Sequence, residues 1–399
     1  SLTTGTSNVA VGYQAGYSIV GYSNNTCVGH QAGYFIKEHN NTAIGALCMK
    51  GGTSGSFERN VGVGSSALER IQDANNNVAI GFNSMAYSQS GVANVAIGDG
   101  SLDSADGDES YNIAIGRNAL GAADGSNVAN CVAIGDNALA GAATYATEIA
   151  IGEDAMLSWL GTANGGSATA GYNIAIGGNA MDANTTGARN IAIGYDALGV
   201  ANVTDNSQTQ NVAIGHDAGN NVSSGTDNVI IGYAAGTVLS VGTKNVIIGS
   251  GAEPSSNDHS YGITIGYDCA GHADGSYMTI GTAESTDRWW IDYGTGTTWA
   301  RESDERLKKN IENSTLGLDF VNNLRAVKYQ WRTGEEQPEE VQRYNKKGKL
   351  ETPIDTESIN YGMIAQEVKS ALDTAGVDDF GGWSENKDGI QALSVSSFV

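Results

Sequence analysis

Two side chains at the start of the last quarter of the chain could carry out nucleophilic chemistry. Ser303 supplies a hydroxyl, and Lys308 follows with an amine that could act as its base. A serine hydroxyl is a poor nucleophile at neutral pH and needs a base, and a lysine can serve when burial lowers its pKa enough to leave it neutral. The plainer interpretation is that Ser303 caps a helix and that Lys308 is a solvated charge. The spacing alone leaves both interpretations open.

Acidic side chains could carry out a different reaction, the hydrolysis of a polysaccharide. That chemistry requires a pair of carboxylates fixed on either side of the scissile bond. The candidates are Glu153, Asp154, Asp196 and Asp217. They stand at equivalent positions of an internal repeat, which is typical of a decorated surface, and none is distinguished from the others. A depolymerase is therefore kept as an alternative function.

The residues that most often bind metals give no such pattern. The four cysteines, Cys27, Cys48, Cys131 and Cys269, are scattered and form no Cys-x-x-Cys motif. They fill repeat positions that elsewhere hold small apolar residues, so we interpret them as core residues. Calcium binding in acidic turns such as 103–108 is an alternative, although the spacing matches neither an EF-hand nor the Gly-Asp nonapeptide roll. We predict no metal site and no cofactor.

A possible receptor contact lies in the longest spacer between repeats, residues 153–172. Met156 and Trp159 stand there beside a run of glycine, serine and alanine. A tryptophan exposed in a loop is a good contact residue for a sugar or a protein. The alternative is that both side chains pack back onto the repeat array or onto a neighbouring subunit.

The elements that must position these residues are set by a repeat. Asn-Val-Ala-Ile-Gly occurs at 77–81, 94–98 and 211–215, and Asn-Ile-Ala-Ile-Gly at 112–116, 173–177 and 190–194. With looser versions there are roughly 15 copies, most often about 17 residues apart, and such a period indicates a stacked solenoid. One repeat cannot bury its own apolar side, so the copies above and below must complete it.

Each copy predicts a short strand with two unlike faces. Val78 and Ile80 share one face, and Ala79 lies on the other. We expect the smooth alanine face to admit a second subunit. Gly81 ends the strand, because glycine reaches positive φ without strain. Asn77 suits a corner and could stack into an asparagine ladder with its equivalents.

Composition supports thin repetitive layers rather than a large globular core. The 399 residues include 55 glycines and 3 prolines, and aromatic residues make up only 7%. The net charge of −23 argues against binding to a nucleic-acid backbone, which requires basic patches. No apolar run approaches the roughly 20 residues of a membrane-spanning helix, so we predict no membrane insertion.

The chain divides into three parts. Residues 1–285 are the repeat shaft, and residues 286–302, which contain three tryptophans, break the repeat and are expected to cap its end. Residues 303–399 form a mixed α/β domain. Within it we expect a helix over 316–324 with Leu318, Val321 and Leu324 on one side, a strand over 327–331, and an extended segment at 361 that becomes a helix ending near Leu372.

The repeats resemble the head domains of trimeric autotransporter adhesins, on the basis of the Val-Ala-Ile-Gly-x-x-Ala motif throughout 1–285. Those heads are parallel β-rolls packed three around an axis, with one repeat in each coil. The resemblance implies a mainly β, repetitive, trimeric β-roll here, followed by a small mixed α/β domain.

A second and more specific resemblance covers the C-terminal domain. Ser303-Asp-Glu-Arg-Leu-Lys-Lys-Asn-Ile311 and Tyr361-Gly-Met-Ile-Ala-Gln-Glu-Val368 resemble the two signatures of the intramolecular chaperone of endosialidase-type phage tailspikes and fibres. That family assists trimer assembly, and many members then cut themselves. The resemblance implies Ser303 as nucleophile, Lys308 as base and Glu302–Ser303 as the scissile bond. It also implies a trimerising helix beyond Val399.

Together these features predict a homotrimeric phage tail fibre, or receptor-binding shaft, with an assembly chaperone at its C-terminal end. The implied partners are two further copies of the chain, a glycan or protein receptor on the host surface, and other tail proteins. The implied location is the virion tail, after synthesis in the host cytoplasm. The alternatives are a polysaccharide depolymerase tailspike and a bacterial trimeric adhesin.

Overall fold

The computed structural model of the chain consists of two compact units, Ser1–Glu302 and Ser303–Val399. The first unit, which we call the shaft, carries the repeats. The structure describes residues 4–52, 55–103, 109–122, 128–141, 147–158, 171–184, 187–200, 209–273, 276–282, 289–292, 299–300, 316–338, 356–357, 359–378, 380, 382–385 and 391–393.

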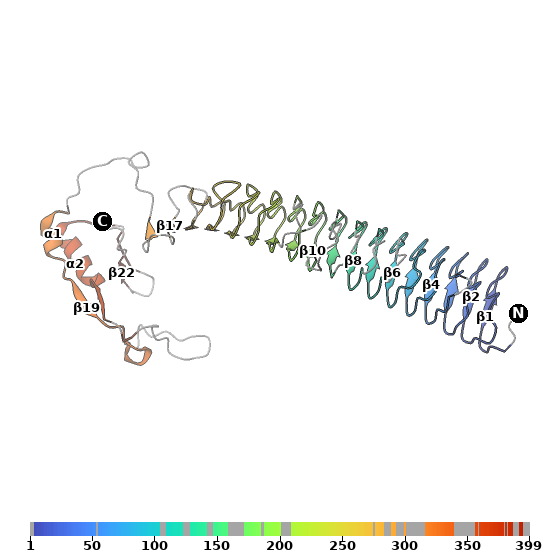
Figure 1. Cartoon of the computed structure of the whole chain (residues 1–399). Helices are drawn as coiled ribbons and strands as arrows, with labels where there is room; N and C mark the ends of the chain where they lie inside the picture. Colours follow the sequence, from blue (N-terminus) through green and yellow to red (C-terminus); the bar gives the residue numbers. More distant parts are fainter. Residues whose placement is uncertain are drawn as a thin grey trace. The chain divides into compact units, whose positions relative to one another are not determined.

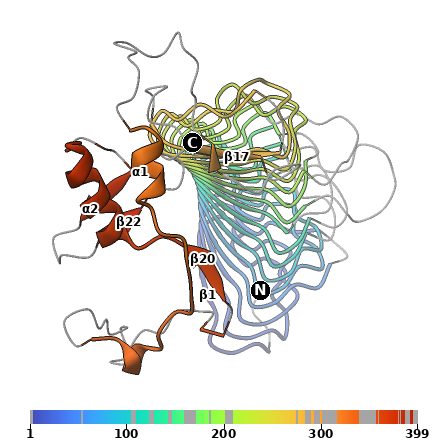
Figure 2. The ribbon, with the colours of Figure 1, turned by 90° about the vertical axis from the view of Figure 1, so that its left-hand side faces the viewer.

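The shaft is a stack of coils, each of which contributes one short strand to a continuous parallel sheet (Figure 1). Seen along the stack, the coils lie over one another and fan round progressively from the first to the last (Figure 2). The strands that follow one another in parallel are β1 (Val9–Val11), β2 (Thr26–Val28), β3 (Thr42–Ile44), β4 (Val61–Val63), β5 (Val78–Ile80), β6 (Val95–Ile97), β7 (Ile113–Ile115), β8 (Val132–Ile134), β9 (Ile149–Ile151), β10 (Ile174–Ile176), β11 (Ile191–Ile193), β12 (Val212–Ile214), β13 (Val229–Ile231), β14 (Val246–Ile248), β15 (Ile263–Ile265) and β16 (Tyr277–Ile280). This mainly β, repetitive parallel solenoid is the fold that the repeat predicts.

The register of the sheet pairs each strand residue with the residue at the same repeat position in the next coil. Ala79 of β5 lies opposite Ala96 of β6, and Ile80 lies opposite Ile97. The close stacking of successive coils requires glycine directly after each strand. Gly81 has a φ of 141°, and a Cβ there would lie only 2.3 Å from the carbonyl oxygen of Gly98 in the next coil. Any side chain would therefore meet both a strained backbone and a steric clash.

Asparagines at the start of each strand form the predicted ladder. The backbone N–H of Asn94 donates to Oδ1 of Asn77 at 2.8 Å, and its Nδ2 donates to the same atom at 3.1 Å. The Nδ2 also donates to the carbonyl oxygen of Glu109 at 2.7 Å, which ties the strand start to a distant turn. Because these amides are fully buried, each bond satisfies a polar group that could not reach water.

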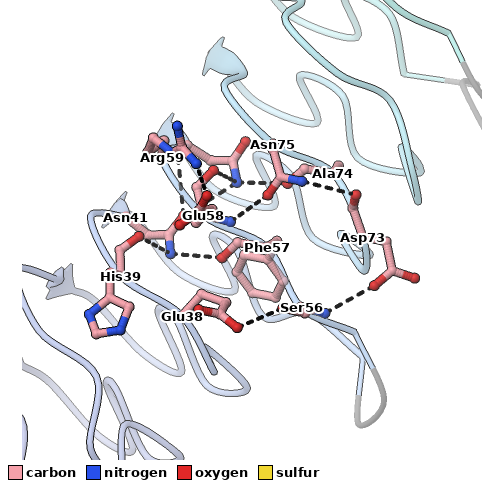
Figure 3. Close-up of polar contacts among 11 residues, drawn as sticks. Glu38, His39, Asn41, Ser56, Phe57, Glu58, Arg59, Asp73, Ala74 and Asn75 are labelled. Carbon is pink, nitrogen blue, oxygen red and sulfur yellow. Dashed lines mark hydrogen bonds and ion pairs between the residues drawn. The ribbon is translucent and has the colours of Figure 1, made fainter.

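A close-up of three successive coils shows how the corners are joined (Figure 3). Asn41 Nδ2 donates to the carbonyl oxygen of Phe57 at 2.9 Å, and the Phe57 side chain is buried. Ser56 bridges neighbouring coils: its Oγ donates to Glu38 Oε1 at 2.7 Å, and its backbone N–H donates to Asp73 Oδ1 at 3.1 Å. Side-chain bonds of this kind connect turns that the strand ladder does not reach.

The alanine face is not the surface that we predicted for a second subunit. Ala79 and the alanines at its position in β3 and in β6 to β12 are fully buried in the core of the solenoid, which also contains Met85 and the Leu or Met residues at its position. Ile80, by contrast, is 37% exposed on the outside. The coil is too thin to hold two β-branched side chains per strand in its interior, so the alanines point inward and the bulky residues point outward.

The sheet changes direction after its last parallel strand. β17 (Trp289–Asp292) runs antiparallel to β16, and β18 (Trp299–Ala300) runs antiparallel to β17. An aromatic cluster lies here, in which the rings of His272 and Tyr277 stack 4.0 Å apart and Trp290 lies 4.9 Å from His272. The reversal ends the parallel ladder within the segment that we expected to act as a cap.

The second unit contains short helices and two antiparallel strand pairs. Its elements are α1 (Leu318–Asn322), β19 (Val327–Tyr329), the 3-10 helix η3 (Gly334–Glu336), β20 (Asn360–Gly362), α2 (Ala365–Ala375), β21 (Trp383–Glu385) and β22 (Gln391–Leu393). β19 pairs with β20, and β21 pairs with β22. The predicted order of helix, strand, extended segment and helix is confirmed. Neither helix has the length and apolarity needed to cross a membrane, as far as the described residues extend.

The predicted buried side of the first helix is wrong. Phe320 is the residue of α1 that is buried, whereas Leu318 and Val321 are 78% and 56% exposed. Phe320 packs with Val368, Ala371 and Leu372 of α2, and Leu324 lies partly buried against this cluster. In a helix of five residues one aromatic side chain decides which side faces the core, and helical spacing of smaller apolar residues does not.

Candidate functional site

The proposed nucleophile and base lie outside the described residues. Glu302, Ser303 and Lys308 belong to the segment 301–315, about which the structure makes no statement. The second signature is largely described. It begins in β20 at Tyr361 and continues into the first turn of α2, where Val368 enters the core of the unit. The helix that carries this signature is therefore anchored by the same apolar cluster that holds α1.

An ion pair joins the second signature to the segment after α1. Arg325 Nε donates to Glu367 Oε2 at 3.0 Å, and a second contact joins Arg325 Nη2 to Glu367 Oε1. The hydrogen bond raises the pKa of Arg325 and lowers the pKa of Glu367, because it favours the charged form of each group. This two-point contact fixes the direction of approach between α1 and α2, although both groups remain in water.

The second unit exposes several large apolar side chains among its described residues. Tyr361 is 80% exposed on β20, Trp331 is 52% exposed just after β19, and Ile359 is 58% exposed just before β20. With Leu318 and Val321 on α1, they leave apolar surface uncovered in an isolated chain.

The predicted receptor contact is not supported at Met156. Its side chain is fully buried, in the slot that holds Leu120 and Leu139 in the two preceding coils. The residue is part of the coil interior and is not available to a ligand. Trp159 lies outside the described residues, so the prediction for that residue stands as made.

The carboxylates considered for glycan hydrolysis lie along one corner of successive coils. Asp154 accepts a hydrogen bond from Asn137 Nδ2 at 3.0 Å, and Asp217 lies 2.9 Å from His216 Nδ1. Asp182 lies close enough to Asp196 and Asp154 to be affected by their charges. Burial is the main cause that raises its pKa, and these two carboxylates add to the effect. Across the described residues no group of His, Cys, Asp and Glu side chains is arranged to hold a metal ion.

The two strand residues that flank the middle residue form a surface that is apolar except for Thr26 and Thr42, and we call this surface the outer face. It comprises the first and third residues of every strand from β1 to β15, such as Val78 and Ile80. Ile44, Val61, Ile80, Ile113 and Ile214 are 36 to 39% exposed, and Val9 and Val11 of the first strand reach 48 and 58%. An apolar row that runs through fifteen coils far exceeds the small isolated patches of ordinary monomer surfaces.

Two rows of larger side chains border the outer face. The leading row holds the residue two positions before each strand, and the trailing row holds the residue two positions after it. Aromatic rings stack along the trailing row, where Tyr195 lies 5.2 Å from His216 and His216 lies 5.5 Å from Tyr233. Arg117 and Asp136 form an ion pair at 2.5 Å in the same row. These contacts run parallel to the stack and stiffen the trailing border of the outer face.

Sequence reasoning missed an interruption of the asparagine ladder. Cys131 and Glu148 occupy consecutive ladder positions between Asn112 and Asn173. Glu148 Oε2 accepts the backbone N–H of Asn173 at 2.8 Å, while Oε1 is buried without a hydrogen-bond partner. Burial raises the pKa of Glu148 to about 8 and that of the Cys131 thiol to about 12. The available signal was the glutamate that replaces asparagine before Ile-Ala-Ile-Gly.

The comparisons with known proteins identify one region of the chain. Residues 303–377 match the family model described as chaperone of endosialidase. No curated protein and no solved structure matches the chain. The matched region begins where the second unit begins and includes α1, β19, β20 and α2. The chain thus carries, after a parallel β-solenoid, a C-terminal region similar to the chaperone of endosialidase.

Proposed function

We propose that this chain is a homotrimeric phage tail fibre, or receptor-binding shaft, whose C-terminal domain is an intramolecular trimerisation chaperone. The observation that carries the proposal is the combination of two features in one chain. A region similar to the chaperone of endosialidase follows a solenoid whose outer face is apolar along its whole length. A chaperone of assembly is needed when a shaft must bury such a face against other copies of itself.

The outer face supports a trimer of parallel shafts. Three copies arranged about an axis parallel to the stack would each turn the Val and Ile rows toward that axis, and the apolar side chains would then leave water. Burying a fully exposed Val or Ile side chain contributes roughly 1.5 to 3 kcal/mol, and these residues are partly exposed over fifteen strands. The sum is ample for a stable interface even after the entropic cost of association.

Autocleavage is part of the proposal. In it, Lys308 accepts the proton of the Ser303 hydroxyl, and the hydroxyl oxygen attacks the carbonyl carbon of Glu302. The Glu302–Ser303 amide bond breaks as the Ser303 nitrogen takes up a proton, which leaves an ester between Glu302 and Ser303 Oγ. Water then hydrolyses this ester and releases a fragment that begins at Ser303. The support is the sequence of the first chaperone signature and the family match that starts at residue 303. Cutting after assembly would leave a shaft trimer held by its own outer face.

The remaining parts of the proposal concern the partners and the location. The mature shaft would be part of the virion tail after synthesis in the host cytoplasm, would join other tail proteins, and would contact a glycan or protein receptor on the host surface. Immunogold electron microscopy of phage particles with an antibody against the shaft tests this location. Label on cell envelopes and none on virion tails would favour a bacterial adhesin instead.

Deletion of the second unit tests the chaperone role. A chain that ends at Glu302 should accumulate as insoluble or monomeric shaft, because its apolar outer face would be exposed before three copies meet. The Ser303→Ala chain is the matched control, since it keeps the chaperone and loses only the proposed cut. Equal yields of soluble trimer from both chains would remove the chaperone role from the proposal.

A further inference from the structure

We infer that the leading row of one protomer packs against the trailing row of its neighbour at the level of each strand. These contacts determine which sides of the two protomers meet. The inference rests on the proposed homotrimer and adds the side chains that determine its contacts. The partner is a second copy of this chain, bound along the borders of the outer face.

Symmetry dictates which rows meet. In a threefold arrangement each protomer presents two different sides to its two neighbours, so the contact joins unlike rows. A rotation about an axis parallel to the stack does not shift a coil along it. The residue two positions before a given strand therefore lies level with the residue two positions after the same strand of the neighbour.

Two strands carry a matched cation and aromatic ring in opposite order. β7 has Tyr111 in the leading row and Arg117 in the trailing row, whereas β11 has Arg189 in the leading row and Tyr195 in the trailing row. All four side chains are exposed in the single chain, with Tyr111 at 63% and Tyr195 at 49%. Pairing across the boundary would place a guanidinium beside an aromatic ring at both levels, which is a favourable contact.

One further level is complementary in hydrogen bonding. At β13 the leading residue is Asp227 and the trailing residue is Tyr233, so that a carboxylate meets a phenol hydroxyl.

The distribution of charge supports the same pairing. No strand from β1 to β15 carries a formal charge in both rows, and the structure describes all of these positions. Arg59 of β4 faces Ser65, Lys244 of β14 faces Ser250, and Asp136 of β8 faces Asn130. A like-charge pair at a level would repel and would oppose closure of the trimer.

Two contacts of border residues within one chain run along the stack rather than across it. Arg117 bonds to Asp136 of the next coil, and Lys244 lies 5.0 Å from the ring centroid of Tyr261 in the next coil. Contacts between protomers would run across the stack. Arg117 and Lys244 are exposed in the single chain, so either side chain could take part in both kinds of contact.

Paired cysteines test the inference directly. In Arg189→Cys/Tyr195→Cys the two positions lie on either side of β11, about 20 Å apart along an extended chain, so they cannot form a disulfide within one chain. Between neighbouring protomers they would be level and adjacent. The four native cysteines are fully buried and should not interfere. Mild oxidation of the full-length protein should give a covalent trimer on a denaturing gel, and reductant should return it to monomer.

Matched variants make the outcome decisive. Tyr111→Cys/Arg117→Cys should behave in the same way at β7. Each single cysteine should stay monomeric on the gel, as should Arg189→Cys/Tyr233→Cys, whose positions differ by two coils, or about 10 Å along the stack. If the wild-type protein has the mass of a trimer but neither level pair cross-links, the row pairing is overturned and the proposed trimer stands. If the wild-type protein is monomeric, or if the covalent product stops at a dimer, the inference and the trimer both fail.

Discussion

At the scale of single residues, Glu148 places an ionisable carboxyl group at a ladder position where most coils have a neutral amide. Its carboxyl is buried in the ladder, with one oxygen bonded to the backbone N–H of Asn173 and the other without a partner. The uncharged form can occupy such a site at low cost, whereas the ionised form loses its hydration. Burial accordingly raises the pKa of Glu148 from 4.5 to about 8.

The resulting pH dependence has a definite sign. Between pH 4.5 and about 8 the unfolded chain ionises Glu148 while the folded chain retains the proton, so the free energy of unfolding falls as pH rises through this window. The loss should be on the order of a few kcal/mol. In Glu148→Gln this part of the pH dependence should vanish. Denaturant unfolding of both proteins at about pH 5 and pH 8.5 measures it, and identical slopes against pH would show that Glu148 is not the cause.

Gly81 should not tolerate a side chain. Its φ of 141° and the 2.3 Å approach of a Cβ to the Gly98 carbonyl predict that Gly81→Ala lowers the free energy of unfolding by at least about 2 kcal/mol. Gly199→Ala is a matched control, because its Cβ would come no closer than 3.4 Å to the Asp196 carbonyl oxygen. Thermal unfolding followed by circular dichroism compares the two. A Gly81→Ala protein as stable as the control would contradict the stacking described here.

The proposed cleavage depends on the side chains of Ser303 and Lys308, which are identified from their sequence context alone. Ser303→Ala should stop the release of a C-terminal fragment by removing the nucleophile, and Lys308→Ala should stop it by removing the base. Lys309→Ala, a change at the adjacent lysine, should leave cleavage intact. N-terminal sequencing of a fragment of roughly 10 kDa, as expected from about 110 Da per residue, provides the measurement. Persistent intact chains in the wild-type protein would remove the protease role and leave the chaperone role in place.

At the scale of elements, the sequence predicts the strands well because each copy of the motif carries its own signals. Glycine after Val-Ala-Ile marks the turn, and asparagine before it marks the ladder; both roles are confirmed at Gly81 and Asn77. The alternation of large and small residues predicts that each strand has two different faces. It does not predict which face lies inside the coil. Only the narrow interior of a coil, where Ala79 meets Met85, decides that question.

The C-terminal unit shows a second limit of the same kind. The order of its helices and strands follows from local patterns, but the burial of Phe320 instead of Leu318 depends on where α2 packs. The Cys131 and Glu148 interruption was visible as two departures from the motif. The raised pKa values of Cys131 and Glu148 could not be inferred from the sequence, because they depend on the burial of both side chains in the structure.

The inward direction of the alanines leads to a prediction for the element. Ala96→Leu should lower the stability of the single coil stack by about 1 to 3 kcal/mol, since three extra carbons must enter a filled interior. Ile97→Leu, a change of similar apolar character on the outer face, should cost less than half as much. Denaturant unfolding below the concentration at which chains associate distinguishes the two. If Ala96→Leu altered only association, the alanines would have to face another subunit.

At the scale of the whole molecule, the outer face and the chaperone-like region explain each other. A chain with an apolar surface along fifteen coils is prone to wrong association while that surface is uncovered. A C-terminal domain that first brings its own copies together would align the shafts from one end, and the bordering rows would then fix their pairing. The exposed apolar side chains of the second unit, such as Tyr361 and Trp331, are suited to such contacts.

The oligomeric mass of the full-length protein tests the central claim most directly. Native mass spectrometry should give about three times the chain mass of 41.2 kDa, or a trimer of shafts where cleavage has occurred. The variant Val78→Thr/Ile80→Thr/Val95→Thr keeps β-branched side chains but makes three outer-face positions polar, and it should shift the population toward monomer. A wild-type protein that is monomeric, or a trimer whose stability this variant leaves unchanged, would contradict assembly through the outer face.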